Sequence, residues 1–257
     1  MITVISPAKT LDFCPQKLTP KASQPEFLED SEELVDTLSG MTKARLKKLM
    51  SISEKLAELN HGRFQDWTTP FDKTNAKQAL LAFKGDVYTG FECDDWNARD
   101  FDFAQKHLRI LSGLHGVLKP LDLIQAYRLE MGTELKTARG KNLYSFWGTK
   151  VTMALDDAIK AAKAKALVNL ASNEYFSVIK PDMLDKPVVT PVFKDWKNGQ
   201  FKIISFFAKK ARGSMANFIV RERVKTPDGL KDFDVDGYSF AGEGKREGEL
   251  LFHRKAG

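Results

Sequence analysis

The densest group of residues that could bind a charged ligand lies between positions 202 and 223. This stretch carries six basic residues and one acidic residue, which almost equals the whole formal surplus of +6. Lys202 lies on an expected strand, and Lys209, Lys210 and Arg212 follow at the start of an expected helix. Cations are unfavourable near a helix N-terminus because of the helix dipole. The pattern therefore indicates a bound phosphate, which the exposed helix amides would also contact.

Two other short segments combine charge with tight backbone. Lys9 follows the first expected strand, at a place where ligands often bind in α/β sheets, and its ammonium group could meet a phosphate. Lys84, Asp86 and Tyr88 lie between glycines 85 and 90. Asp86 and Tyr88 share a face only if the segment is extended. They would then suit general acid–base catalysis, although a salt bridge beside a buried tyrosine explains them equally well.

Polar residues also gather in two segments further along the chain. Arg128 and Glu130 share one face of residues 125–132 if that segment is a strand. Asn173, Glu174 and Tyr175 follow a buried strand, which is a common arrangement at a ligand site. Ser172 or Asn173 would equally serve as the cap of the next helix.

Several familiar chemistries have no motif here. None of the four histidines has a second histidine three or four residues away, and Cys14 and Cys93 lie far apart in the sequence, so we predict no metal site. P-loop, dinucleotide-binding and nucleophile-elbow motifs are all absent from the sequence. We therefore expect no cofactor, assign no catalytic residue and leave open whether the protein is an enzyme, with the balance against it.

The elements that must position these residues alternate irregularly between helix and strand. The 257 residues are 42% hydrophobic, enough for one large core, so we predict one mixed α/β (α+β) domain over residues 1–257. Strands are expected at 2–6, 166–171, 187–196 and 201–208, with short strands at 238–240 and 250–252. Helices are expected at 25–38, 42–59, 74–81, 100–111, 142–164, 173–179 and 209–225.

Charge distribution and compartment complete what composition can say. Acidic residues cluster away from the basic stretch, which would direct polyanions to one face; alternatively, each run is the solvated face of its own helix. No stretch is long and apolar enough to span a membrane, and the first residues lack the pattern of a signal peptide. With only two cysteines, we expect a cytoplasmic protein without disulfides and without a membrane partner.

Several of these segments occur together, and in the same order, in one known family. The chain resembles the YaaA family of bacterial peroxide-stress proteins, on the evidence of residues 5–11, 83–90, 111–132, 146–148, 169–176 and 201–213. The resemblance implies a protein of the hydrogen peroxide response that limits iron-driven damage to DNA and binds double-stranded DNA. It also implies an unusual mixed α/β fold with a basic cleft and a helix-hairpin-helix-like element.

The helix-hairpin-helix element would fall at the turn between Gly113 and Gly116, whose amides would then position a DNA phosphate. This turn has one residue more between its glycines than the usual motif. The predicted DNA contacts are these two glycines together with Lys9, Lys84, Arg128, Lys202, Lys209, Lys210 and Arg212.

Two other functions stay open at this point. One is an enzyme acting on a phosphorylated or nucleotide-like small molecule, with Asp86, Tyr88, Arg128, Asn173, Glu174 and Tyr175 lining its pocket. The other is an iron-binding protein, although the sequence shows no cluster of ligands for iron. The two leading functions differ in geometry: a duplex needs a broad groove, and a small molecule needs an enclosed pocket.

Overall fold

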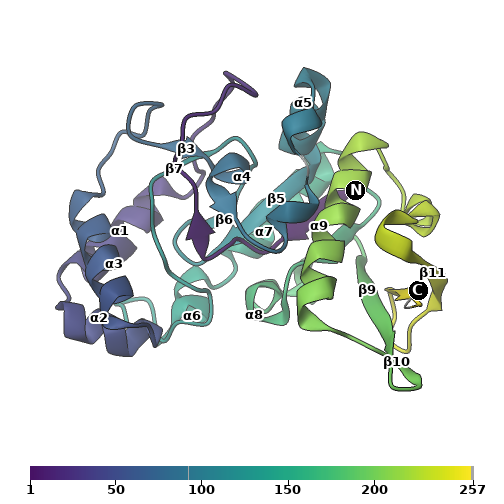
Figure 1. Cartoon of the computed structure of the whole chain (residues 1–257). Helices are drawn as coiled ribbons and strands as arrows, with labels where there is room; N and C mark the ends of the chain where they lie inside the picture. Colours follow the sequence, from purple (N-terminus) through teal and green to yellow (C-terminus); the bar gives the residue numbers. More distant parts are fainter. Residues whose placement is uncertain (92, 256–257) are drawn as a thin grey trace.

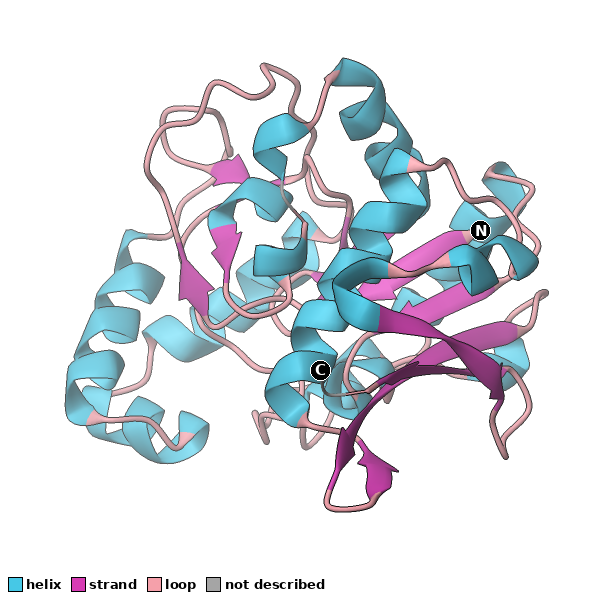
Figure 2. Cartoon of the chain, turned by 45° about the vertical axis from the view of Figure 1, so that its right-hand side comes forward, coloured by secondary structure: helices cyan, strands magenta, loops and turns pink. Residues whose placement is uncertain are grey.

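An eight-stranded mixed sheet forms the centre of the computed structural model, which describes residues 1–91 and 93–255 (Figures 1 and 2). The strand order is β11-β12-β9-β8-β1-β5-β6, and β10 pairs with β9. Its central strands are β1 (Ile2–Ile5), β5 (Leu108–Ser112) and β8 (Leu167–Leu170). They run parallel to one another, with β1 in the middle. All residues of β1 and β8 are buried, as expected for parallel strands covered on both faces.

The sheet extends to both sides of these strands. On one side, β6 (Gly116–Leu118) turns back antiparallel to β5. On the other side lie β9 (Val188–Lys197), β10 (Gln200–Lys202), β11 (Tyr238–Glu243) and β12 (Glu249–Arg254). Asn198 and Gly199 adopt positive φ in the tight turn that joins β9 and β10 as a hairpin.

Helices pack around this sheet. α9 (Ser205–Arg221) contacts β1, β8 and β9, while α5 (Ala98–His107) contacts β1, β5 and α9. α7 (Lys150–Ala161) packs against β1 and β6. α1 (Leu28–Ser39), α2 (Lys43–Met50) and α3 (Glu54–Asp66) form a separate group of helices at the left of Figure 1.

Short elements complete the chain. The two-stranded pairs are β2 (Thr10–Leu11) with β4 (Phe83–Lys84), and β3 (Lys77–Gln78) with β7 (Leu123–Ile124). The short helices are α4 (Ala79–Ala82), α6 (Leu143–Trp147) and α8 (Asn173–Phe176). The short 3-10 helices of the described residues are η1 (Tyr88–Gly90), η2 (Cys93–Asp95), η3 (Pro181–Met183), η4 (Asp228–Asp232) and η5 (Val235–Gly237). The mixed α/β class is thus confirmed, as one compact unit.

Several predicted helices are shorter than expected. The helix over 42–59 is two helices, because Ser51 adopts a left-handed conformation between α2 and α3. The helix over 142–164 is likewise interrupted, at Gly148, which also has positive φ. The helix over 74–81 is largely wrong, since β3 occupies residues 77–78. The helix over 100–111 ends at His107, where the chain continues as β5.

The correction with most bearing on function concerns residues 201–208. We predicted a strand there, followed by a helix from 209, but α9 already begins at Ser205. Lys209, Lys210 and Arg212 therefore lie beyond the first helical turn, and the argument from cations at a helix N-terminus does not apply to them.

Candidate functional site

The loops that follow the parallel strands leave the sheet at the same edge, which we call the carboxyl edge. Ser6 follows β1 and Ser172 follows β8, the neighbouring strand. The Ser172 amide donates a hydrogen bond to Ser6 Oγ at 2.9 Å, and the two hydroxyl oxygens lie 3.4 Å apart. Residues 6–10 and 172–175, which the sequence marks separately, therefore belong to one site.

The segment 83–90 joins this edge through its backbone and one tyrosine. Lys84 pairs with Thr10 in the β2–β4 ladder, and Tyr88 Oη donates to the Ser6 carbonyl at 3.2 Å. Burial raises the pKa of the Tyr88 phenol well above its usual value, so this group stays protonated and acts as a donor. Asp86 instead lies 3.5 Å from Lys209. The structure thus favours a salt bridge and a separate tyrosine over an Asp86–Tyr88 acid–base pair.

Helix α9 docks on the same segment with almost no space between the two backbones. A Cβ built on Gly213 would lie 1.8 Å from the Val87 carbonyl oxygen, and one on Gly90 would lie 2.4 Å from the Ser214 amide nitrogen. Only glycine permits this approach. This contact is what brings Lys209 beside Asp86, although the two residues are far apart in the sequence.

A cluster of charges lies where residues 125–132 pass the loop after β1. Arg128 contacts Glu130 Oε1 through Nε at 3.2 Å and a terminal nitrogen at 2.9 Å, and Lys9 Nζ contacts the same oxygen at 3.1 Å. Residues 125–130 form no regular strand, so the condition for the expected shared face is not met, yet Arg128 and Glu130 are in contact. Burial lowers the pKa of Arg63 on α3, and the positive charge of Arg128 lowers it further. Arg63 therefore belongs to this neighbourhood, which the sequence did not indicate.

Glu174 and Tyr175 lie beside this cluster. Glu174 accepts a hydrogen bond from the Gly132 amide at 3.1 Å, and its own carbonyl accepts one from Tyr144 Oη at 2.8 Å. Ser172 is the residue before α8, but its side chain makes no capping bond. Ser172 therefore occupies the cap position, but the side-chain hydrogen bond expected from it does not form. The Asn173 carbonyl accepts from Ser177.

A very small cavity lies among these residues, with room for about one water molecule. Its volume is about 10 Å³. Its walls include Lys9, Tyr127, Arg128, Glu130 and Tyr175. The ion pair of Lys9 with Glu130 spans two of these walls. Because the Lys9 side chain is 65% exposed, this pair contributes little stability and can open to admit a ligand.

The predicted DNA contacts are not all together. Lys9, Lys84 and Arg128 lie near the carboxyl edge. Lys209 contacts Asp86 in the segment 83–90, which joins this edge. Lys210 instead contacts Asp236 near the C-terminal strands, at 3.1 Å, and Lys202 lies exposed on β10. Arg212 is half-buried, and burial lowers the pKa of its guanidinium. Among the described residues, no acidic group lies within ion-pair distance of Arg212.

Gly113 and Gly116 form the buried turn between β5 and β6. A Cβ on Gly113 would lie 2.2 Å from the Leu129 carbonyl oxygen, and one on Gly116 would lie 2.9 Å from the Trp147 ring. Close packing therefore explains both glycines. The element before this turn is strand β5, not the helix expected to continue through residue 111. The contact of this turn with a phosphate stays a prediction, and it requires the turn to open.

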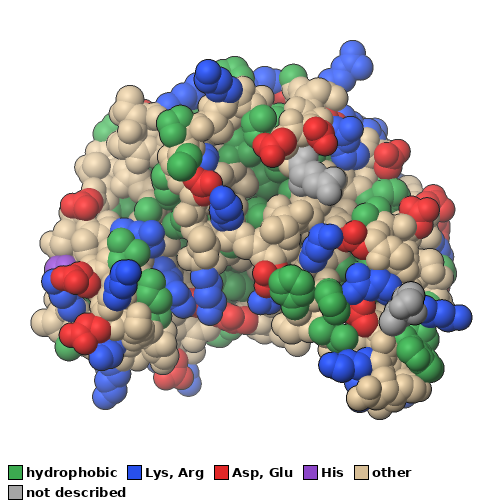
Figure 3. All heavy atoms as spheres, viewed as in Figure 1, with side chains coloured by type: hydrophobic (Ala, Val, Ile, Leu, Met, Phe, Trp, Pro, Cys, Tyr) green, Lys and Arg blue, Asp and Glu red, His purple; other side chains and the backbone are tan. Residues whose placement is uncertain are grey.

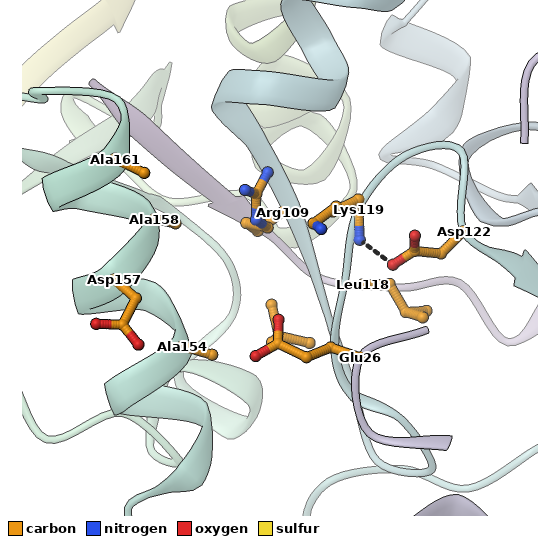
Figure 4. Close-up of a pocket in the computed structure, with 10 residues that line it drawn as sticks. Glu26, Arg109, Leu118, Lys119, Asp122, Ala154, Asp157, Ala158 and Ala161 are labelled. Atoms are coloured by element: carbon orange, nitrogen blue, oxygen red, sulfur yellow. Dashed lines mark hydrogen bonds between the residues drawn. The ribbon is translucent and has the colours of Figure 1, made fainter. Parts of the chain in front are cut away.

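A larger cavity lies away from the carboxyl edge, between α7 and β6 (Figure 4). Its volume is about 230 Å³. Figure 4 shows Arg109, Glu26 and Asp157 around it, with helix α7 on one side. Arg109 donates to the backbone carbonyls of Gln105 and Leu108, which fixes its position in the fold. None of the segments singled out by sequence contributes to this cavity except the β5–β6 region.

The described residues, 1–91 and 93–255, contain neither a metal-binding cluster nor a membrane-spanning helix. Within these ranges, no group of three or more His, Cys, Asp or Glu side chains is arranged to hold a metal ion. No helix there combines the length and apolarity needed to cross a bilayer.

Fold and site together define a mixed α/β protein in which distant basic and acidic segments meet at the carboxyl edge of a parallel sheet. Comparison with known proteins gives its family. The family model described as "Peroxide stress protein YaaA" matches residues 1–243. A "UPF0246 protein" of Teredinibacter turnerae is 54% identical over 255 residues, which cover 99% of this chain and 100% of that relative. The chain belongs to the YaaA family of peroxide stress proteins, and the resemblance predicted from the sequence is confirmed.

Proposed function

We propose that the protein binds duplex DNA through its phosphates in the cytoplasm during peroxide stress and thereby limits iron-driven damage. Membership of a peroxide stress family supports the setting. The observation that carries DNA binding is the gathering of cations from three distant segments. Lys9 follows β1, Lys84 lies on β4 and Lys209 lies on α9. Their side chains are 65%, 67% and 50% exposed, respectively.

The acidic partners of these lysines do not prevent phosphate binding. Lys9 contacts Glu130, Lys84 contacts Asp12 at 3.2 Å, and Lys209 contacts Asp86. In each pair the lysine is exposed and the carboxylate is less so, and ion pairs at the surface contribute roughly 0–1 kcal/mol each. Replacing the carboxylate by a DNA phosphate therefore costs little free energy, and release of counterions from DNA favours the exchange. Binding of this type has weak sequence preference, because phosphates carry no base information.

Salt dependence tests this proposal. With three phosphate contacts, the log–log slope of affinity against salt is expected near −2.7, so affinity should fall about 40-fold between ~50 and ~200 mM salt. The measurement is fluorescence anisotropy of a labelled random-sequence duplex at several salt concentrations. A flat response would refute a phosphate-driven mechanism.

Arg212 favours a second candidate function, an enzyme that acts on a phosphorylated or nucleotide-like small molecule. Within residues 1–91 and 93–255 no carboxylate pairs with this half-buried guanidinium, and such a group is a receptive site for an anion. Calorimetry with inorganic phosphate and nucleoside phosphates tests this function. Binding that is lost in Arg212→Ala, with duplex affinity retained, would favour the enzyme over the DNA-binding protein.

A further inference from the structure

The start of α9 and the residue pair before it present a group of apolar side chains to solvent, which we call the α9 apolar patch: Ile203, which precedes the helix, and Phe206 and Phe207 in its first turn. They are 58%, 59% and 38% exposed. Figure 3 shows hydrophobic side chains beside basic ones in the lower right of the molecule, where α9 begins. The sequence predicted a strand with buried apolar side chains here, but in the structure these three side chains face solvent.

The two phenylalanine rings are held in a fixed arrangement. Phe206 and Phe207 meet edge to face, with 5.6 Å between their centroids. The Arg254 guanidinium lies over the Phe207 ring at 4.4 Å, which anchors that ring by a cation–π contact. Phe206, the more exposed of the two, therefore offers a positioned aromatic surface to a ligand.

Basic residues surround the α9 apolar patch. On a helix, residues three and four positions apart lie on the same side, which places Lys209 and Lys210 beside Phe206. Lys202 lies exposed on β10, one residue before Ile203. The acidic groups at these lysines are Asp86, 3.5 Å from Lys209, and Asp236, 3.1 Å from Lys210. Exposed aromatic rings with cations at their margin are complementary to a ligand that carries both flat rings and negative charges.

We infer that the α9 apolar patch binds single-stranded nucleic acid, with an unpaired base stacked on Phe206 and neighbouring phosphates on Lys202 and Lys209. Single-strand-binding proteins combine the same two elements, aromatic platforms and a basic path for the backbone. An intact duplex keeps its bases stacked inside and offers none to such a ring. The inference rests on the proposed DNA binding and extends it from phosphates to unpaired bases.

The test compares three labelled ligands of equal length: single-stranded oligo-dT, a duplex, and an abasic single strand. The variant is Phe206→Ala/Phe207→Ala, and the control is Met153→Ala, which removes an exposed apolar side chain from α7. Stacking is expected to make the double variant 10-fold to 100-fold weaker for oligo-dT. Its affinity for the duplex and the abasic strand should change less than 3-fold, and Met153→Ala should match the wild type throughout.

The other outcomes separate this inference from the proposed function. Equal oligo-dT affinity in the wild type and the double variant, with duplex binding intact, would overturn the inference alone. Failure of the wild type to bind any of the three ligands would remove the proposed function as well. Self-association or vesicle binding that depends on Phe206 and Phe207, without loss of oligo-dT affinity, would assign the α9 apolar patch to another partner and overturn the inference. Thermal unfolding confirms that each variant is folded.

Discussion

Replacing Gly213 with alanine tests the contact that joins α9 to residues 87–90. The added Cβ would lie 1.8 Å from the Val87 carbonyl oxygen. Because both partners are backbone, no change of side-chain rotamer relieves the overlap, and the helix must move. Overpacking of this kind costs about 3 kcal/mol, while alanine recovers roughly 1 kcal/mol of helix propensity relative to glycine. The variant should therefore be less stable by about 2 kcal/mol.

Urea unfolding followed by tryptophan fluorescence measures this difference in free energy. Gly62 provides the matched control, since it also lies inside a helix, α3, but a Cβ there meets nothing within 4 Å. Gly62→Ala should leave stability unchanged or raise it by up to about 1 kcal/mol. Gly213→Ala should also bind duplex DNA more weakly, because Lys209 moves away from the carboxyl edge. Wild-type stability in Gly213→Ala would refute the backbone contact.

Three further predictions concern charge. Glu130→Gln removes the carboxylate shared by Lys9 and Arg128, so duplex affinity, measured by anisotropy, should rise several-fold; a decrease would show that Glu130 positions these cations for binding. Burial lowers the pKa of His115 to about 3, below its unfolded value near 6.5, so its contribution to stability is complete above pH ~6.5 and is lost as pH falls toward 3. Between pH 6.5 and 5.0 the wild type should lose about 1.6 kcal/mol from this residue, and His115→Phe should lack that part of the slope in urea unfolding; identical slopes would contradict the buried neutral imidazole. Asp100, almost fully buried, accepts from Arg221, Arg223 and the Asn97 amide, so Asp100→Ala should cost about 2–3 kcal/mol after allowing for the partly exposed arginines. Asp102 is half-exposed and pairs only with the exposed Lys21 among the described residues, so Asp102→Ala should cost under about 1 kcal/mol, and equal effects of the two substitutions would argue against the link between α5 and α9.

The sequence predicted correctly those strands and turns that are determined by local composition and not by the segments that pack against them. The apolar runs of β1 and β8 indicate buried strands by composition alone. Asn198-Gly199 indicates its hairpin because both residues tolerate positive φ. Thr42 is a residue type that favours the cap position, and it caps α2 by accepting from the Arg45 backbone amide.

The errors occur where a short apolar run fits two structures. Residues 203–208 suit a buried strand as well as a helix. Tertiary packing decides for the helix, since Ala208, Ala211 and Met215 face the core. Ser51 has no sequence signal for its left-handed conformation, so the break between α2 and α3 could not be predicted.

The candidate site was predictable in its parts and not in its assembly. Arg128 and Glu130 are two residues apart, so their contact is local in the sequence, although no strand forms there. The pairs Lys84–Asp12 and Lys209–Asp86 join residues far apart in sequence, and Arg63 lies near Arg128 only because of how α3 is placed. Such contacts follow from topology, for which a single sequence gives no local pattern.

The central claim is that exposed lysines from three segments act together on DNA phosphates. The most direct measurement compares Lys9→Ala/Lys84→Ala/Lys209→Ala with Lys43→Ala/Lys47→Ala/Lys48→Ala, which removes the same charge from the exposed face of α2. Duplex affinity is measured at three salt concentrations. The account predicts that the first variant loses affinity for all sequences alike and that its salt slope becomes shallower by about 2.7, while the second changes little. Equal effects of the two variants would contradict it, because binding would then depend on net charge and not on this site.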